Sequence, residues 1–345
     1  MAMDMDERKM RILQAIIDDY ILTGVPVGSR TISKKYDMGL ASATIRNEMS
    51  DLEELGFLDQ PHVSAGRIPS AKAYRLYVDS LLRNGSIPDD SEASIRSLFT
   101  GRIHQMEDVI DHAAQVISNL THYTAVVLSP KGIQPRIQTV QLVPVSTETA
   151  LVVIVTDQGI VRDSIIRIGG QMDSDTLYSI SRTLTEELRG ATLQEACKKM
   201  PAISERVSGN DRILQELYGY LADGQRSPKR SHMAIGGTSN ILAYPEYSDV
   251  DKARNFLSLI ETRDKLADII RGSGEMSFTV RIGPETGVPE MTDCSIVTAA
   301  YSTGNGQQGT IGVIGPTRMQ YSRVLSILDI IGHQLTDLFG GGDGE

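Results

Sequence analysis

Near the N-terminus, apolar and polar residues alternate with the period of an α-helix. Over residues 42–55, Ile45, Met49 and Leu52 recur at i, i+4 and i+7 and form one apolar stripe, while the opposite side carries small, polar or cationic groups. Ser42 precedes the stripe, and its hydroxyl can accept a hydrogen bond from an unpaired N–H of the first turn, so we expect it to be the N-cap. The pattern predicts an amphipathic helix whose first two turns carry small, uncharged or cationic side chains on the outer face.

Two further helices are predicted before this segment. A stripe of five apolar residues, at i, i+3, i+4, i+7 and i+8 from Leu13, predicts a helix over about residues 6–22. A second, shorter helix is expected from Ser29 to Tyr36. A tight turn at residues 37–40 separates it from the third helix. Helix, helix, short glycine-containing turn and helix is the order of a helix-turn-helix, although a generic three-helix bundle shows the same pattern.

A predicted β-hairpin follows the third helix. Residues 57–58 and 67–68 have the character of short strands, and the loop between them contains Pro61 and Gly66. A hairpin directly after a helix-turn-helix is a wing, which can lie along the sugar-phosphate backbone or in the minor groove of DNA. Ser70 then caps another amphipathic helix.

The polar side chains of this N-terminal part suggest how it would contact DNA. Arg and Asn at the tip of a helix in the major groove can form bidentate hydrogen bonds with guanine and adenine. We predict that the groove-facing tip consists of Ser42, Thr44, Arg46 and Asn47. The predicted phosphate contacts are Ser29, Arg30 and Lys34. The predicted wing contacts are His62, Ser64 and Arg67. Taken alone, any solvated amphipathic helix would show a similar polar face.

The distribution of charge fits a small DNA-binding part attached to an acidic remainder. The 345 residues carry a net charge of −10, which argues against a basic coat over the whole surface. Residues 1–83 hold 11 Lys and Arg against 12 Asp and Glu, so the remaining residues carry −9. Residues 20–47 and 60–83 each contain four basic residues and one acidic residue, which predicts two local basic patches.

Several long motifs resemble a known family. The segments ATIRNEM, PHVSAGRIP and IGVIGPTRMQY, with the sequence around them, resemble the bacterial heat-inducible transcription repressors of the HrcA family. Ala73 is one departure, because the family usually has Gly at this place before the Tyr-Arg pair. The resemblance implies a homodimeric repressor of chaperone genes that binds double-stranded DNA at an inverted-repeat operator (CIRCE). It also implies dependence on a GroEL-type chaperonin and a GAF-like domain with a dimerising insert.

The rest of the chain alternates between strand and helix patterns, which predicts an α+β multidomain protein. We expect a helix over about 92–121, strands over 124–128, 136–145 and 150–168 in one antiparallel sheet, helices over 173–222, and strands and helices again from 232. The expected division is a winged helix-turn-helix DNA-binding domain (1–83), a linker (84–91), a GAF-like domain in two parts (92–172 and 229–345) and an inserted helical dimerisation domain (173–228). Alternatively, the helices predicted over residues 173–222 belong to the same α+β core as the strands around them and form no separate domain.

Other function classes find little support in the sequence. Cys197 and Cys294 stand alone, without a CxxC or Cys/His cluster, so we expect buried, reduced thiols and neither a metal site nor a cofactor. Glycines in the segment GTIGVIGPT match no phosphate-binding motif and indicate a closely packed strand. With no GxSxG elbow, an enzyme is not expected, whereas a small-molecule-sensing winged-helix factor remains an alternative. No apolar run is long enough to span a membrane, so a cytoplasmic location without membrane contact is expected.

Overall fold

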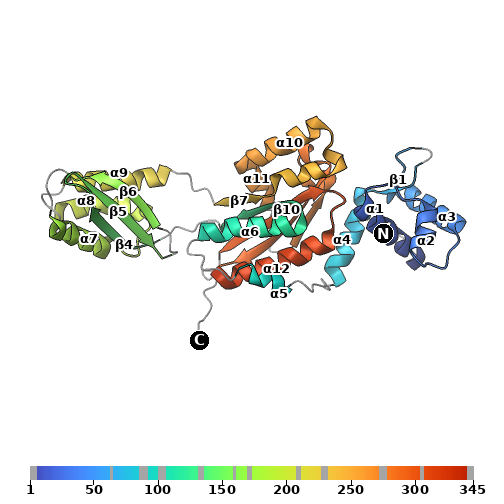
Figure 1. Ribbon diagram of the computed structural model, residues 1–345, viewed down its shortest axis with the longest axis horizontal. Coiled ribbons are helices and arrows are strands. Elements are labelled where there is room, and N and C mark those ends of the chain that lie inside the picture. The colour runs from blue at the N-terminus through green and yellow to red at the C-terminus, as the bar shows by residue number, and fades with distance from the viewer. Residues whose placement is uncertain are drawn as a thin grey trace. The chain divides into compact units, whose positions relative to one another are not determined.

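The computed structural model (Figure 1) is a mixed α+β protein whose strand pairings are antiparallel. It divides into two compact units, the first made of Met1–Thr100, Asp111–Leu128 and Met233–Glu345, and the second of Gly101–Ile110 and Ser129–His232. The structure describes residues 6–62, 65–84, 92–99, 106–130, 136–157, 161–168, 173–206, 211–226, 232–271, 278–303 and 307–339. Of the predicted linker, residues 84–91, Asn84 is the last residue of a helix, and residues 85–91 lie outside the described ranges.

The N-terminal part of the first unit, called here the head, contains three helices and a two-stranded hairpin. α1 begins where the Asp6 carboxylate accepts the Lys9 N–H at 2.7 Å, and it ends at Gly24. All three predicted helices and both predicted strands are present. The elements of the head are α1 (Glu7–Thr23), α2 (Ser29–Lys35), α3 (Ser42–Glu54), β1 (Leu58–Asp59) and β2 (Ile68–Pro69), and α4 (Ala71–Asn84) follows directly.

The predicted N-cap of α3 is wrong. The N-cap position is occupied by Ala41, and Ser42 is the first helical residue. Its hydroxyl lies 3.0 Å from the hydroxyl of Ser29, the first residue of α2, so the two side chains tie the starts of these helices together. Ser70 does cap α4 as expected, because its hydroxyl accepts the Ala73 N–H at 3.3 Å.

A five-stranded antiparallel sheet, covered by helices on both faces, forms the rest of the first unit and is called here the body (Figure 1). Ile311 faces Gly332 of α12, and the neighbouring Gly312 faces Ile270 of α11, so these helices cover opposite faces. The strand order is β7-β3-β10-β9-β8. The strands are β3 (Thr124–Leu128), β7 (Met233–Gly236), β8 (Phe278–Ile282), β9 (Cys294–Ser302) and β10 (Gln308–Pro316).

Two helical regions of the body are divided into shorter helices. The region 92–121 contains α5 and α6 instead of the one helix expected, and the region 250–270 contains α10 and α11. Thr262 separates the latter pair, because its backbone, at φ −82° and ψ 74°, is not helical. The helices are α5 (Glu92–Ser97), α6 (Met106–Thr121), α10 (Val250–Glu261), α11 (Arg263–Ile270) and α12 (Tyr321–Phe339), with short 3-10 helices η1 (Thr238–Ala243), η2 (Pro245–Tyr247), η3 (Gly283–Thr286) and η4 (Pro289–Met291).

The second unit combines a three-stranded sheet with three helices. Ser181 and Thr185 of α7 accept hydrogen bonds from the N–H groups of Leu142 and Val140 at 2.8 and 3.0 Å. These hydroxyls satisfy backbone groups that a free strand edge would leave unpaired. The strands, in the order β4-β5-β6, and the helices are β4 (Ile137–Pro144), β5 (Thr149–Thr156), β6 (Val161–Arg167), α7 (Ser174–Leu188), α8 (Leu193–Arg206) and α9 (Asp211–Arg226).

The division expected from the sequence differs from this grouping. The sequence pattern predicts residues 136–168 in the same antiparallel sheet as residues 124–128, but β4–β6 pair only with one another among the described strands. Their apolar residues Val140, Val152 and Ile166 share a core with α7–α9. The second unit therefore begins well before residue 173, because the sheet that the helices cover lies earlier in the chain.

Close packing explains the glycines of β10, as the sequence indicated. A Cβ on Gly309 would lie 2.1 Å from Cζ of Tyr301, whose side chain is buried and whose hydroxyl donates to the Leu128 carbonyl at 3.0 Å. A side chain at Gly309 would therefore displace this ring. The lack of a side chain at this position therefore serves the packing of the sheet.

Neither cysteine forms a disulfide and both are buried, as expected. The Cys294 thiol lies 2.7 Å from the Tyr247 hydroxyl, and burial raises the pKa of Cys294 to about 11. Because the thiolate is the reactive form, this thiol is a packing element of the body at neutral pH. Among the described helices, none has the length and apolar character needed to cross a membrane.

Gly309→Ala is expected to destabilise the first unit by about 1–3 kcal/mol, because the new methyl group overpacks the buried Tyr301 ring. Gly332→Ala is the matched control: its Cβ would make ordinary contacts of 3.6 and 3.7 Å inside α12. Ala favours a helix over Gly by up to about 1 kcal/mol, so this variant should be neutral or more stable. Denaturant unfolding of both variants measures the difference. Equal stability of the two would contradict the packing argument.

Candidate nucleic-acid interface

α3 has one buried face and one exposed face. Ile45, Met49 and Leu52 have exposed fractions of 0%, 4% and 0% and pack into the head. Arg46 and Asn47, which the sequence places on the opposite side, are exposed. The burial of the inner stripe therefore fixes which side of the helix faces outward.

Ion pairs with α1 hold the buried side of α3. Glu48 is buried and forms ion pairs with Arg8 and with Lys9, whose Nζ lies 3.1 Å from the carboxylate. Lys9 also lies 3.1 Å from Asp51, and these hydrogen bonds to Glu48 and Asp51 raise the pKa of Lys9. Both acids are thus neutralised from the α1 side. Sequence reasoning missed this pairing, because Glu48 falls between the apolar positions of the stripe.

The first predicted basic patch is partly free. Arg30 and Lys34 of α2 are exposed, and within the described residues neither they nor Arg46 has an ion-pair partner. Lys35 instead pairs with Asp19 of α1, which is buried. Three cations on α2 and α3 therefore remain available for an anionic partner.

The second predicted basic patch does not form a free surface. Arg67 pairs with Glu53 of α3 through N–O distances of 2.7 and 2.8 Å. Lys72 donates to the Leu55 carbonyl at 2.7 Å, at the C-terminus of α3, and Arg75 pairs with Glu285 of the body. These cations stabilise the protein itself, which residue counts along the sequence cannot distinguish from a surface patch.

The hairpin is held firmly at its base. The backbones of Val27 and Arg67 exchange two hydrogen bonds of 2.8 Å, which join the hairpin to the segment after α1. His62 is exposed in the loop, whereas Ser64 lies outside the described residues. Of the predicted wing residues, His62 is thus placed at the surface and Arg67 is bound to Glu53.

The predicted groove-facing residues lie in the first two turns of α3. Arg46 and Asn47 are exposed, and Ser42 and Thr44 are half-buried, with Ser42 in contact with Ser29. This surface offers hydrogen-bond donors and a positive charge on a convex helix, which suits the major groove of DNA. Elsewhere in the described part of the chain, no group of three or more His, Cys, Asp or Glu is arranged to hold a metal ion.

Comparisons with known proteins cover nearly the whole chain. A family model described as the HrcA protein C-terminal domain matches residues 107–325. The heat-inducible transcription repressor HrcA of Clostridium perfringens is 40% identical over 334 residues, which are 96% of this chain and 98% of that protein. The protein of the same name from Clostridium tetani is 42% identical over 342 residues, which are 97% and 96% of the two chains.

One crystal structure has a similar fold. It belongs to a protein described as hypothetical, shares 26% sequence identity, and superposes with a TM-score of 0.75 over 97% of this chain and 98% of that one. The two relatives named HrcA and the family model confirm the resemblance carried by the ATIRNEM, PHVSAGRIP and IGVIGPTRMQY motifs over most of the chain. The chain belongs to the HrcA family of heat-inducible transcription repressors.

Proposed function

We propose that the protein is a sequence-specific repressor that binds double-stranded DNA with an N-terminal winged helix-turn-helix domain, residues 1–83. One observation carries the proposal: the apolar stripe of α3 is buried, and Arg46 and Asn47 point outward. An α-helix fits the major groove, where these two side chain types can form bidentate bonds with guanine and adenine. Family membership does not favour the alternative of a small-molecule sensor.

Each predicted residue has a proposed role. Arg46 and Asn47 contact base edges, with Ser42 and Thr44 beside them. Ser29, Arg30 and Lys34 bind phosphates, and the wing contributes through His62 and Ser64. Arg67 supports the wing through its pair with Glu53, so its part in DNA binding is chiefly to position the hairpin.

We propose further that the protein is a cytoplasmic homodimer that binds an inverted repeat. The body is assigned to the GAF-like domain, and the second unit to the dimerising insert. A row of apolar side chains supports this assignment. Val143, Leu151 and Ile165 are direct cross-strand neighbours on β4, β5 and β6, on the sheet face opposite the core residues Leu142 and Val152. Val143 is 44% exposed and Ile165 is 65% exposed, so a second copy would bury apolar surface there.

Arg46→Ala is expected to weaken binding to the inverted-repeat operator by about 1–3 kcal/mol and to relax base preference, because a base contact is lost. Lys34→Ala should weaken binding to operator and random duplexes alike and reduce the slope of log affinity against log salt by about 1. Quantitative gel shifts with operator and scrambled duplexes at several salt concentrations measure both effects. Equal losses on the two duplexes for Arg46→Ala would contradict its assignment. Wild-type protein that does not prefer the operator would contradict the proposed function itself.

Ile165→Asp is expected to shift the dimer towards monomer, because it places a charge at the most exposed position of the apolar row. Ser179→Asp, an exposed position on α7, is the matched control and should leave the dimer intact. Sedimentation velocity over a concentration series measures the equilibrium. A dimer of unchanged stability in the Ile165 variant would show that the interface lies elsewhere.

A GroEL-type chaperonin is the proposed regulator. In this proposal the folded repressor is marginally stable, the chaperonin maintains it, and heat occupies the chaperonin with other clients. The fraction of purified protein able to bind operator should therefore rise when chaperonin and ATP are added, and most at elevated temperature. Titration of operator with and without chaperonin measures this fraction. If the fraction able to bind operator is the same with and without chaperonin at every temperature, the proposed regulation by chaperonin is contradicted.

A further inference from the structure

Two arginines from distant parts of the chain join the head to the body. Arg318 lies between β10 and α12, and its guanidinium pairs with Glu246 and lies 5.6 Å from the centre of the Tyr244 ring. It also donates to the Ile21 carbonyl of α1 at 3.2 Å. Only 11% of its side chain is exposed. Burial lowers the pKa of Arg318 but the Glu246 carboxylate raises it, with a net upward direction.

Arg318 supplies what the end of α1 lacks. The last carbonyls of a helix have no intrahelical partner and carry partial negative charge, which a cation stabilises. The last turn of α1 contains no basic residue of its own. Gly24, which ends the helix with φ +66°, leaves room for the contact, because a Cβ there would lie 3.2 Å from Arg318 Cζ. An arginine of the body therefore provides the hydrogen bond and the positive charge that stabilise the C-terminus of α1 in the head.

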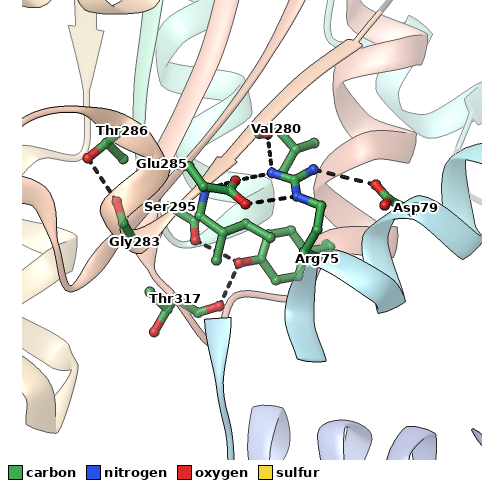
Figure 2. Close-up of polar contacts among 10 residues, drawn as sticks. Arg75, Asp79, Val280, Gly283, Glu285, Thr286, Ser295 and Thr317 are labelled. Carbon is green, nitrogen blue, oxygen red and sulfur yellow. Dashed lines mark hydrogen bonds and ion pairs between the residues drawn. The ribbon is translucent and has the colours of Figure 1, made fainter. Parts of the chain in front are cut away.

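The second arginine lies on α4 and contacts the edge of the body sheet (Figure 2). Arg75 forms a two-point ion pair with Glu285 and donates to the Val280 carbonyl at 2.6 Å. Glu285 is itself fixed, because its carboxylate accepts the Ile282 N–H at 2.9 Å. Asp79, one turn further along α4, lies 3.5 Å from the same guanidinium.

α4 also connects these contacts to the head. The ring of Tyr74 lies 5.9 Å from the ring of Tyr321, whose hydroxyl bonds to Ser295 at 2.7 Å within the body. On the other side, the Tyr77 hydroxyl lies 3.3 Å from the carboxylate of Asp18 in α1. One helix thus contacts the first helix of the head and the strands and last helix of the body.

We propose that Arg75 and Arg318 are positioning residues that fix the head on the body and thereby set which half-site spacing a dimer can bind. This inference rests on the proposed function. The contacts lie at the end of α1 and on α4, and they leave Arg46 and Asn47 exposed. They orient the DNA-binding surface without covering it.

The physical consequence concerns two heads rather than one. In a dimer, the second head binds at an effective concentration that is greatest when its position matches the second half-site. Fixed heads favour half-sites in one helical phase and disfavour those shifted by about half a turn, or about five base pairs. Loosened heads lose some of this advantage at the native spacing but tolerate other spacings. Binding to a single half-site is unaffected.

A first experiment tests the contact without DNA. Spin labels are placed on Gln14→Cys of α1 and Asn255→Cys of α10, both exposed positions, and the two native thiols are buried. Labelled chains are diluted with unlabelled ones so that intrachain distances dominate. Arg75→Gln with Arg318→Gln should broaden the distance distribution. Lys265→Gln, which breaks a 3.1 Å surface pair with Glu290 on the body, should leave it narrow. An unchanged distribution in the double variant would overturn the proposal, whether or not the protein binds DNA.

A second experiment measures spacing selectivity. Wild type, the Arg75→Gln/Arg318→Gln double variant and Lys265→Gln are titrated with the inverted repeat, with repeats lengthened by five and by ten base pairs, and with a single half-site. For the double variant we expect affinity on the order of tenfold lower at the native spacing, a reduced penalty for the five-base-pair insertion, and wild-type affinity for the half-site. Equal losses on every duplex, or a gain at the native spacing, would overturn the positioning role. Failure of wild type to distinguish the repeat from scrambled DNA would instead refute the proposed function.

Discussion

The burial of one face of α3 determines which side chains of the head point outward. Ile45, Met49 and Leu52 occupy the head core, and Glu48 is drawn to the same side by Arg8 and Lys9. Rotation of α3 about its axis would expose the stripe and bury Arg46 without a partner, both at considerable cost in free energy. The outward direction of Arg46 and Asn47 is therefore a consequence of core packing. The fold of the head therefore determines which residues form the proposed recognition surface.

The cations near this surface divide into two groups by their partners. Lys35, Arg67 and Lys72 are engaged by acids or backbone carbonyls of the head, whereas Arg30 and Lys34 lie open beside α3. The engaged cations join α2 to α1, and the hairpin and α4 to α3, so they support the surface on which the two open cations lie. A net charge close to neutral in residues 1–83 is thus compatible with a locally positive recognition face.

Local structure was predictable from the sequence where it follows from short-range periodicity. Nearly all helices and strands of the head could be predicted from the apolar stripes of α1 and α3 and from the turn residues around the hairpin. This is because the elements of the head are consecutive in the chain and pack on their neighbours. Strand partners were not predictable in this way: β3 pairs with β7 and β10, which lie more than a hundred residues away, while β4–β6 form a separate sheet. The α4 contacts of Arg75 with Glu285 were equally hidden, because they join residues from opposite ends of the chain.

The central claim is that the exposed tip of α3 occupies the major groove of both operator arms. Dimethyl sulfate protection measures this directly, because the reagent methylates guanine N7, which faces the major groove. With the dimer bound to an inverted repeat, guanines in each arm should be protected symmetrically at N7. Full binding with every arm guanine still reactive would contradict the account.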